Sequence, residues 1–363
     1  MKGSSSDIER GCALFARAQE LRDAGNPIQA RALCKRALSL LENALGPRHP
    51  DVANVLLEIA GTFEDCGESA MAIEPCERAA AILARVRCGI EGELLKFASL
   101  SLLGRLYVAA GRYREAKKSC TRALHVAEQK LGHAERCDAH NGLGVVHRHL
   151  GKLDIAEAHY RQSLALLGRP RPPQAMATLY HNLAGLEHAR GQHARGIVLA
   201  RRGLRLREKA LGPAHVSVAA DKAALASLYE GKGDLAAAAT LYHEAIAIFR
   251  KAYGPKHFEV GFNLGNLAAI LHEQGRLSEA SKMYRRALAI QEEAAGASHP
   301  FLALLLENFA SLRLAKNRPV EAAALQDRAI AIYSRALGSR HPDTLAARKT
   351  RRDIMRCVER STW

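Results

Sequence analysis

The sequence has few aromatic residues and no long apolar segment. Aromatic residues make up 5% of the 363 residues, with a single tryptophan, while alanine, leucine and arginine are abundant. This composition favours helices packed through small side chains and argues against a β-rich fold. No apolar run approaches the roughly 18 residues that a membrane span needs, and the N-terminal MKGSSSDIERG lacks the apolar core of a signal peptide. We therefore expect a cytoplasmic all-α protein with no membrane partner.

Motifs for catalysis and metal binding are also missing. None of the eight cysteines forms a C-x-x-C pair, and no Cys/His group has the spacing of a zinc site. The 16 histidines include no H-E-x-x-H motif, and the sequence has no triad order and no glycine-rich phosphate loop. We predict that the protein carries no metal and no cofactor and is not an enzyme. We expect reduced thiols, because large helical proteins do not need disulfides.

One register runs through the whole chain at intervals of 40 to 44 residues. A glycine, replaced by asparagine in the last unit, recurs at Gly25, Gly67, Gly111, Gly151, Gly191, Gly233, Gly275 and Asn317. A small residue stands seven places before each of them, at Ala18, Ala60, Gly104, Gly144, Ala184, Ala226, Ala268 and Ala310. Another stands five places after each, at Ala30, Ala72, Ala116, Ala156, Gly196, Ala238, Ala280 and Ala322. Three columns in one register indicate a repeat protein.

The three columns describe a pair of helices joined by a turn. The small side chains let helix A and helix B of each pair approach closely, and the glycine or asparagine tolerates the left-handed conformation that ends helix A. One such hairpin cannot bury its apolar face alone, so neighbouring hairpins must stack. We therefore predict an α-solenoid of eight helix-turn-helix repeats over residues 1–340, followed by a capping helix and tail over residues 341–363.

The small-residue columns resemble those of the tetratricopeptide repeat, with a longer period. A recurring loop accounts for part of the extra length, at 45–53, 211–219, 253–261, 295–303 and 337–346. With N-L-A at 182–184 and 266–268, this loop is similar to that of kinesin light chain-type tetratricopeptide domains. The resemblance implies a right-handed solenoid whose concave groove, lined by helix A, binds a protein or peptide. It does not include the heptad region through which kinesin light chains join their motor, so we expect a separate scaffold.

Three local features qualify this regular pattern. The histidine that recurs in the loops is expected to cap or pack against the next helix rather than to bind a ligand. Pro75 is expected to kink or delay helix B of the second repeat. The proline-rich link at 168–173 replaces the usual loop with an extended one, and we interpret it as a flexure between repeats 1–4 and 5–8.

Counting from the turn residues gives the helix A positions that, by the resemblance, line the groove. Asparagine occupies one of these positions in repeats 5, 7 and 8, where its amide can hold the backbone of an extended peptide by donating and accepting hydrogen bonds. The alternative is that these asparagines are merely polar residues on an open face. The predicted peptide-binding residues are Arg105, Asn141, Arg148, His149, His181, Asn182, His188, Asn266, His272 and Asn308.

The net charge of +16 suggests acidic partners, but most of this charge lies outside the predicted groove. The groove positions hold three arginines and eight carboxylates, and only the stretch from repeat 3 to repeat 5 is basic. We therefore expect an acidic peptide segment to lie beside Arg105 and Arg148. Its binding is predicted to tighten below about pH 6.5, as the groove histidines become charged.

Two basic clusters lie on the predicted outer side, at 201–209 in helix B of repeat 5 and at 348–352 in the capping helix. Either cluster could contact phosphates, so a nucleic-acid- or phosphate-binding solenoid that acts through its convex face is the alternative function. Solvated faces are the commoner explanation, because no stacking aromatic residues or base-reading motif accompany the clusters. Nucleic acid is therefore the less favoured partner.

Three cysteines belong to a packing column rather than to a reactive site. Cys34, Cys76 and Cys120 stand at the helix B position that holds tyrosine in later repeats. A column that alternates between cysteine and tyrosine is typical of the core. We predict that these thiols are buried and are not nucleophiles.

Overall fold

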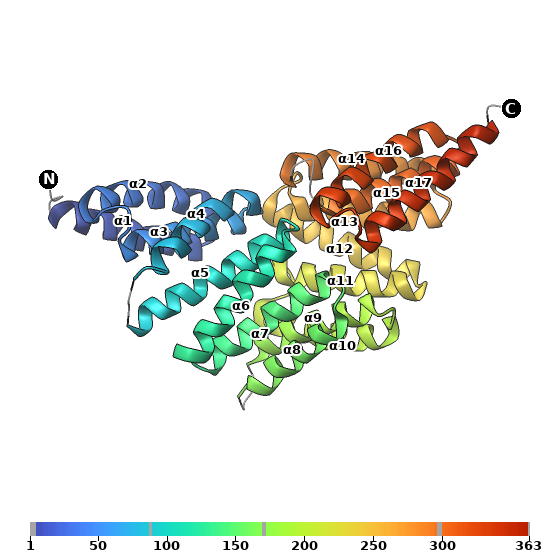
Figure 1. Cartoon of the computed structure of the whole chain (residues 1–363). Coiled ribbons are helices and arrows are strands. Elements are labelled where there is room, and N and C mark those ends of the chain that lie inside the picture. The colour runs from blue at the N-terminus through green and yellow to red at the C-terminus, as the bar shows by residue number, and fades with distance from the viewer. Residues whose placement is uncertain (1–4, 87–88, 169–171, 296–299, 362–363) are drawn as a thin grey trace. The chain divides into compact units, whose positions relative to one another are not determined.

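The computed structural model describes residues 5–86, 89–168, 172–295 and 300–361. Within these ranges the chain forms seventeen α-helices and no β-strand (Figure 1), which confirms the predicted all-α fold. The contacts divide the chain into two units, Met1–Arg171 (unit 1) and Pro172–Trp363 (unit 2). The boundary falls within the link 168–173, of which residues 169–171 lie outside the described ranges. The flexure predicted there stays a prediction.

Each unit is a series of helical hairpins in which an odd-numbered helix A is followed by an even-numbered helix B. Unit 1 contains α1 (Ser5–Asp23), α2 (Pro27–Leu45), α3 (Pro50–Asp65), α4 (Ser69–Leu83), α5 (Ile90–Ala109), α6 (Tyr113–Lys130), α7 (His133–His149) and α8 (Leu153–Leu166). Unit 2 contains α9 (Pro173–Ala189), α10 (His193–Leu211), α11 (Val216–Lys232), α12 (Leu235–Tyr253), α13 (Phe258–Glu273), α14 (Leu277–Ala295), α15 (Pro300–Ala315), α16 (Pro319–Ala336) and α17 (Pro342–Ser361).

The eight predicted turn residues all have the left-handed conformation. The seven glycines have φ between 70° and 87°, and Asn317 has φ 56°. Asn317 is the single non-glycine residue with positive φ in the part of the chain that the structure describes. A residue with a Cβ atom is strained at such angles, and asparagine tolerates them better than most. The recurring glycine, or Asn317 in the last repeat, therefore ends helix A and reverses the chain toward helix B.

The recurring loop histidine caps the next helix A, as predicted. The Nδ1 atom of His49 accepts a hydrogen bond from the backbone N–H two residues later, over 3.3 Å. His215, His257 and His341 make the same bond over 3.1, 3.2 and 3.3 Å. This bond satisfies one of the N–H groups that the first turn of a helix leaves without a partner. The histidine of the fourth such loop, His299, lies outside the described residues.

The small residue seven places before each turn packs against the residue nine places after it. A Cβ atom added to Gly104 would lie 2.4 Å from the Cys120 sulfur, and one added to Gly144 would lie 2.4 Å from the Tyr160 ring. The large or sulfur-containing members of this helix B column are nearly or fully buried: Cys34, Cys76, Cys120, Tyr160, Tyr242 and Tyr284. The burial of Cys34, Cys76 and Cys120 confirms that they are core thiols, and it raises the pKa of Cys34 and Cys76 to about 12 and that of Cys120 to about 11.

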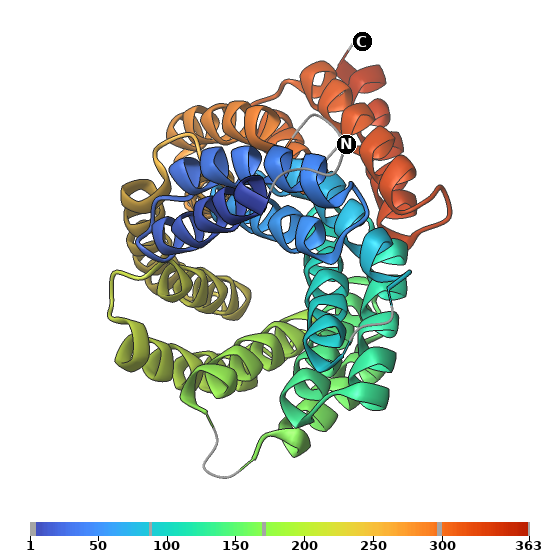
Figure 2. The same cartoon turned by 90° about the vertical axis from the view of Figure 1, so that its left-hand side faces the viewer.

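Helices A and B take different places in the stacking. Within a unit, each helix B packs between its own helix A and the helix A of the next repeat, as α2 does between α1 and α3. Successive helices A also touch one another, as α9, α11, α13 and α15 do in unit 2, whose hairpins follow in chain order in Figure 2. Within the described ranges, no two helices B pack as closely as this, although long side chains join some of them, as the ion pair between Arg78 on α4 and Glu42 on α2 does. Helices A therefore form the tighter, inner layer of each stack.

The effect predicted for Pro75 on the start of its helix is wrong. Helix α4 begins at Ser69 and continues through Pro75 to Leu83, so the proline does not delay the helix. It is instead the C-terminal end of α4 that is short, since α2 and α14 each have 19 residues and α4 has 15. At the other end of the chain, Ile354 of α17 packs against Ala310 and Ala322, and α17 thereby covers the last hairpin.

Candidate functional site

All ten predicted peptide-binding residues lie on helices A. Four of them belong to unit 1, on α5 and α7, and six belong to unit 2, on α9, α13 and α15. Because helices A form the inner layer of each stack, these side chains start from the side on which a groove was expected. Each unit therefore carries its own candidate surface. The polar side chains of the two surfaces have different hydrogen-bond and ion-pair partners.

In unit 1, Arg105 on α5 is already bound to a carboxylate of the preceding repeat. Its Nε and Nη2 atoms donate to Glu64 on α3 over 3.1 and 3.0 Å, although 60% of the side chain is exposed. One repeat earlier, Arg22 on α1 donates to Asp65 over 2.6 Å and to Glu58 over 3.3 Å. The arginines therefore bridge successive helices A, and a carboxylate of a partner would compete with Glu64 for Arg105.

His149, at the end of α7, does not have the charge that the sequence suggested. Its ring stacks on Tyr113 with the centroids 5.1 Å apart, and its Nε2 atom lies 3.4 Å from Nη2 of the half-buried Arg148. Burial and, to a smaller extent, the charge of Arg148 lower the pKa of His149 to about 3. The prediction that this histidine becomes charged near pH 6.5 is therefore wrong. Asn141, also predicted, lies half-buried two turns earlier on α7.

Three further histidines lie together between α7 and α8. The Nδ1 atoms of His140 and His159 are 3.0 Å apart, and the rings of His147 and His159 stack at 5.5 Å. Burial and then the two neighbouring imidazoles lower the pKa of His159 to about 4. The repeat register gave no indication of this cluster. No group of three or more His, Cys, Asp or Glu side chains among the described residues is arranged to hold a metal ion.

We expect unit 1 to lose stability as the pH falls from about 6.5 toward 4. The folded-state pKa values of His149 and His159 lie below the ordinary value of 6.5, so in this window the unfolded chain binds protons that the folded chain does not. Since both side chains are partly exposed, we expect a loss of about 1 kcal/mol for each histidine between pH 6.5 and pH 5. Urea unfolding followed by circular dichroism at the two pH values measures the loss.

Replacing His149 and His159 together by glutamine should remove about 2 kcal/mol of this pH dependence. Replacing the exposed His125 on α6 should leave it as in the wild type. If the double variant kept the full pH dependence, the titrating groups would lie elsewhere in the chain.

In unit 2, His181 belongs to a charged network that joins repeats 5 and 6. Its Nδ1 atom donates to Asp221 on α11 over 2.7 Å, and Nε of Arg207 on α10 donates to the other carboxylate oxygen over 2.7 Å. Asp221 is 4% exposed and Arg207 12%, while 35% of the His181 side chain reaches solvent. Because the carboxylate fixes the Nδ1–H tautomer, the Nε2 atom is the one left to meet a ligand.

The three asparagines that share a register position are not equivalent. Asn182 on α9 is only 9% exposed, and Asn266 on α13 bonds to the buried Tyr242. Asn308 on α15 is half-buried and makes no hydrogen bond to the described residues. Of the remaining predicted residues, His188 is exposed with its ring 5.3 Å from that of His193, and His272 is half-buried near the end of α13. Asn308 therefore offers the freest amide of this face.

An apolar surface beside these polar groups was missed in the sequence. Phe262 on α13 and Leu304 on α15 occupy the same helix A register, thirteen residues before their turns. The ring of Phe262 packs 5.2 Å from that of Phe301, and Leu304 is 48% exposed. The register count could have found both, because they stand four residues, about one helical turn, before Asn266 and Asn308. Only polar residues were predicted for the groove.

The outer basic clusters are partly occupied by contacts within the chain. Arg201 donates to the hydroxyl of Tyr229 and lies over its ring, and Arg207 is bound to Asp221. In α17, Arg351 makes two hydrogen bonds to Asp327, over 2.8 and 3.0 Å. These contacts leave fewer free cations for phosphate groups than the sequence suggested.

Comparison with protein families agrees with the repeat register. A model of the tetratricopeptide repeat matches residues 9–85, 96–168, 175–251 and 222–293, and a second model of this repeat matches residues 302–343. The chain belongs to the tetratricopeptide repeat family. This membership confirms the predicted repeat type and indicates a protein–protein interaction scaffold. A search of curated proteins found no match.

Several solved structures are similar to this tetratricopeptide repeat protein. A Rap protein complexed with competence and sporulation factor has a TM-score of 0.59 at 14% identity, over 97% of this chain and 99% of its own. Aspartyl phosphate phosphatase F from Bacillus subtilis has a TM-score of 0.59 at 13% identity, over 80% and 72%. A putative kinesin light chain from Podosopora anserina has a TM-score of 0.41 at 23% identity, over 56% and 97%. The first two likenesses, at 14% and 13% identity, show a common fold alone.

Two further expectations concern activity and membranes. Because one structural relative is named as a phosphatase, the absence of enzymatic activity stays a prediction for this tetratricopeptide repeat protein. None of the helices in the described ranges has the length and apolar character required to cross a bilayer.

Proposed function

We propose that the helix A face of unit 2 binds an extended segment of a partner protein and that asparagine amides hold the backbone of this segment. The observation that carries the proposal is Asn308, a half-buried amide with no hydrogen bond to the described residues. An amide in this state can donate to and accept from a peptide group at once. Asn266 stands at the same register on the neighbouring helix A, so the two amides would contact successive parts of one segment.

Apolar and charged side chains add specificity to this proposed contact. Leu304 and Phe262 lie at the next groove position toward the helix N-termini and would receive an apolar side chain of the partner. On α9, the exposed His188 and the oriented His181 would meet an acidic side chain. The carboxylates of Glu273 and Glu307 disfavour an acidic side chain beside the later repeats.

We expect Asn308→Ala to weaken binding of the partner segment about tenfold, because a peptide group would lose its hydrogen bond in a contact that excludes water. The full-length protein serves to capture the partner from a lysate, after which the dissociation constant of a synthetic peptide from the captured partner is measured by fluorescence anisotropy. Asn43→Ala, which removes an exposed amide from the helix B α2, is the matched control and should bind like the wild type.

The same binding measurement also tests the alternative function, in which the outer basic surface binds the partner. Arg348→Glu combined with Arg352→Glu reverses two exposed charges on α17. If this pair abolished partner binding while Asn308→Ala left the dissociation constant unchanged, the outer basic surface rather than the helix A face would be the binding site. Circular dichroism should show wild-type helicity for every variant, so that a loss of affinity is not a loss of fold.

A further inference from the structure

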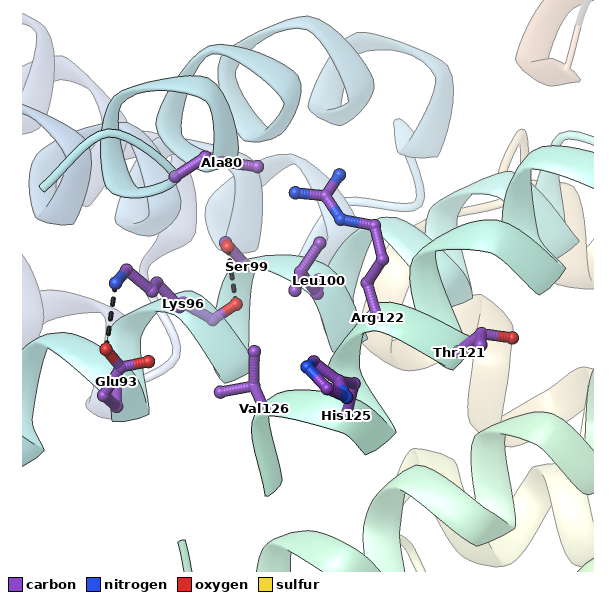
Figure 3. A pocket seen from close by; sticks show the side chains of 10 residues that line it. Ala80, Glu93, Lys96, Ser99, Leu100, Thr121, Arg122, His125 and Val126 are labelled. Carbon is purple, nitrogen blue, oxygen red and sulfur yellow. Dashed lines mark hydrogen bonds and ion pairs between the residues drawn. The ribbon is translucent and has the colours of Figure 1, made fainter. Parts of the chain in front are cut away.

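Unit 1 contains a pocket of about 530 Å³ that lies apart from the predicted groove residues. It is bounded by the end of α4, by α5 and by α6 (Figure 3). Ala80, Ala84 and Leu100 supply apolar walls, and Lys96, Arg122 and His125 supply nitrogen atoms. Figure 3 shows Arg122 and His125 extending from α6 toward the space below Ala80. The residues that other repeats have at the same register indicate which kind of ligand this pocket would fit.

A cross-repeat ion pair closes the equivalent space in two other repeats. In repeat 2, Arg78 stands eleven residues after its turn glycine and donates to Glu42 on the preceding helix B. In repeat 8, Arg328 stands at the same register and donates to Glu292 on the preceding helix B. Both glutamates stand seventeen residues after their own turns, and a leucine precedes each of them by four residues.

Repeat 3 has the arginine of this pair without its partner. Arg122 occupies the arginine register, but Ala84 stands where the glutamate would be, and Ala80 stands where the leucine would be. Helix α4 also ends at Leu83, just before the glutamate register, whereas α2 and α14 continue past it. Because alanine stands at both the glutamate and the leucine position, a space remains between α4 and α6. Arg122 makes no ion pair or hydrogen bond with the residues that the structure describes.

The charges around the pocket favour an anion at Arg122. Lys96 on α5 is paired with Glu93 over 2.9 Å, and both side chains are 17% exposed, so these two charges offset each other. Arg122 has no such compensation, and the imidazole of His125 lies on the same face of α6. A guanidinium binds a carboxylate through two parallel hydrogen bonds.

We propose that this pocket binds a small aliphatic carboxylic acid. The carboxylate of the ligand takes the place of the missing glutamate on Arg122, and its alkyl chain takes the place of the missing leucine, against Ala80 and Leu100. The ligand thus completes the contact between two helices B that other repeats make with their own side chains. This site is separate from the proposed peptide-binding face of unit 2, and neither proposal depends on the other.

Octanoate is the probe for this proposal, with octan-1-ol and acetate as comparators that lack the charge or the chain. Titration of the full-length protein, followed by calorimetry, should give a dissociation constant of about 0.1–1 mM for octanoate and at least tenfold weaker binding of either comparator. Arg122→Gln should weaken octanoate binding at least tenfold. The matched control is Arg286→Gln, which removes an exposed arginine of the same register from a repeat where Ile246 and Arg250 hold the two positions.

A second variant tests the missing side chain directly. Ala84→Glu restores the glutamate of repeats 1 and 7, so it should pair with Arg122 and reduce octanoate binding at least tenfold without lowering the melting temperature. Weaker binding in both Arg122→Gln and Ala84→Glu, with Arg286→Gln unchanged, supports the proposal. Failure of the wild type to bind octanoate below 10 mM (about tenfold above the expected range), or wild-type affinity in Arg122→Gln, would overturn it.

Discussion

Replacing Asp221 with alanine is expected to lower the free energy of unfolding by about 3–5 kcal/mol. Its carboxylate is 4% exposed and accepts hydrogen bonds from His181 and Arg207, each over 2.7 Å. Without it, the guanidinium of Arg207, which is 12% exposed, remains buried with no carboxylate to balance its charge. Removing one partner of a buried ion pair costs more than the pair contributes to stability, because the remaining charge has lost its hydration and no longer has an opposite charge to compensate for it.

Urea unfolding of the full-length variant measures the total loss, and hydrogen exchange locates it. The amides of α9, α10 and α11 should exchange faster than in the wild type, since the network joins these three helices. Asp327→Ala is the matched control, because Asp327 also binds an arginine, Arg351, but is 56% exposed. We expect this control to lose less than about 1 kcal/mol. A similar loss in both variants would mean that burial does not determine the contribution of Asp221.

Gly144→Ala is expected to destabilise the protein by about 2–3 kcal/mol, although alanine is the better helix former. Within an exposed helix, replacing glycine by alanine stabilises by about 1 kcal/mol. At this place the new Cβ atom would lie 2.4 Å from the ring of the fully buried Tyr160. Tyr242 and Tyr284 pack beside alanine at this register, but the Tyr160 ring has settled against glycine and would have to shift within a close-packed interior. Thermal and urea unfolding both measure the effect.

The sign of this effect should reverse when the ring is removed. In a Tyr160→Cys background, Gly144→Ala reproduces the buried alanine–cysteine pairs of repeats 1 and 2, Ala18 with Cys34 and Ala60 with Cys76, and should stabilise the protein by about 1 kcal/mol relative to that background. Gly142→Ala on the same helix is the control in the wild-type background. Its Cβ atom would meet the Cys120 sulfur at 3.5 Å, an ordinary contact, so it should stabilise by about 1 kcal/mol. Destabilisation of equal size by both substitutions would point to α7 itself rather than to Tyr160.

The repeat register was sufficient to predict the hairpins, because they depend on local residues. The left-handed turn at Asn317, the histidine caps and the buried Cys34 column all follow from positions counted within one unit. The start of α4 did not follow, since the general cost of proline in a helix was applied to Pro75 without regard to packing. Pro75 is buried, and tertiary contacts outweighed the intrinsic preference.

The polar contacts were harder to predict because they join different repeats. Arg105 binds Glu64, 41 residues away, and His181 binds Asp221, 40 residues away, so each partner lies about one repeat length along the chain. Within a single repeat, the charged member of such a pair looks unpartnered. Its partner becomes visible when side chains one repeat length apart in the sequence are compared. The pKa of His149, by contrast, depends on burial beneath Tyr113, which no spacing reveals.

The pattern of helix contacts has a consequence for cooperativity. Within each unit, every substantial contact joins helices of one repeat or of adjacent repeats, so the stability of the stack is close to a sum of terms from single hairpins and their nearest neighbours. Hairpins at the ends of such a stack open more easily than those in the middle. A peptide lying across α13 and α15 would add to the direct contact between these two helices A and so strengthen the coupling of two adjacent repeats. Binding would then slow the opening of hairpins that the ligand never touches.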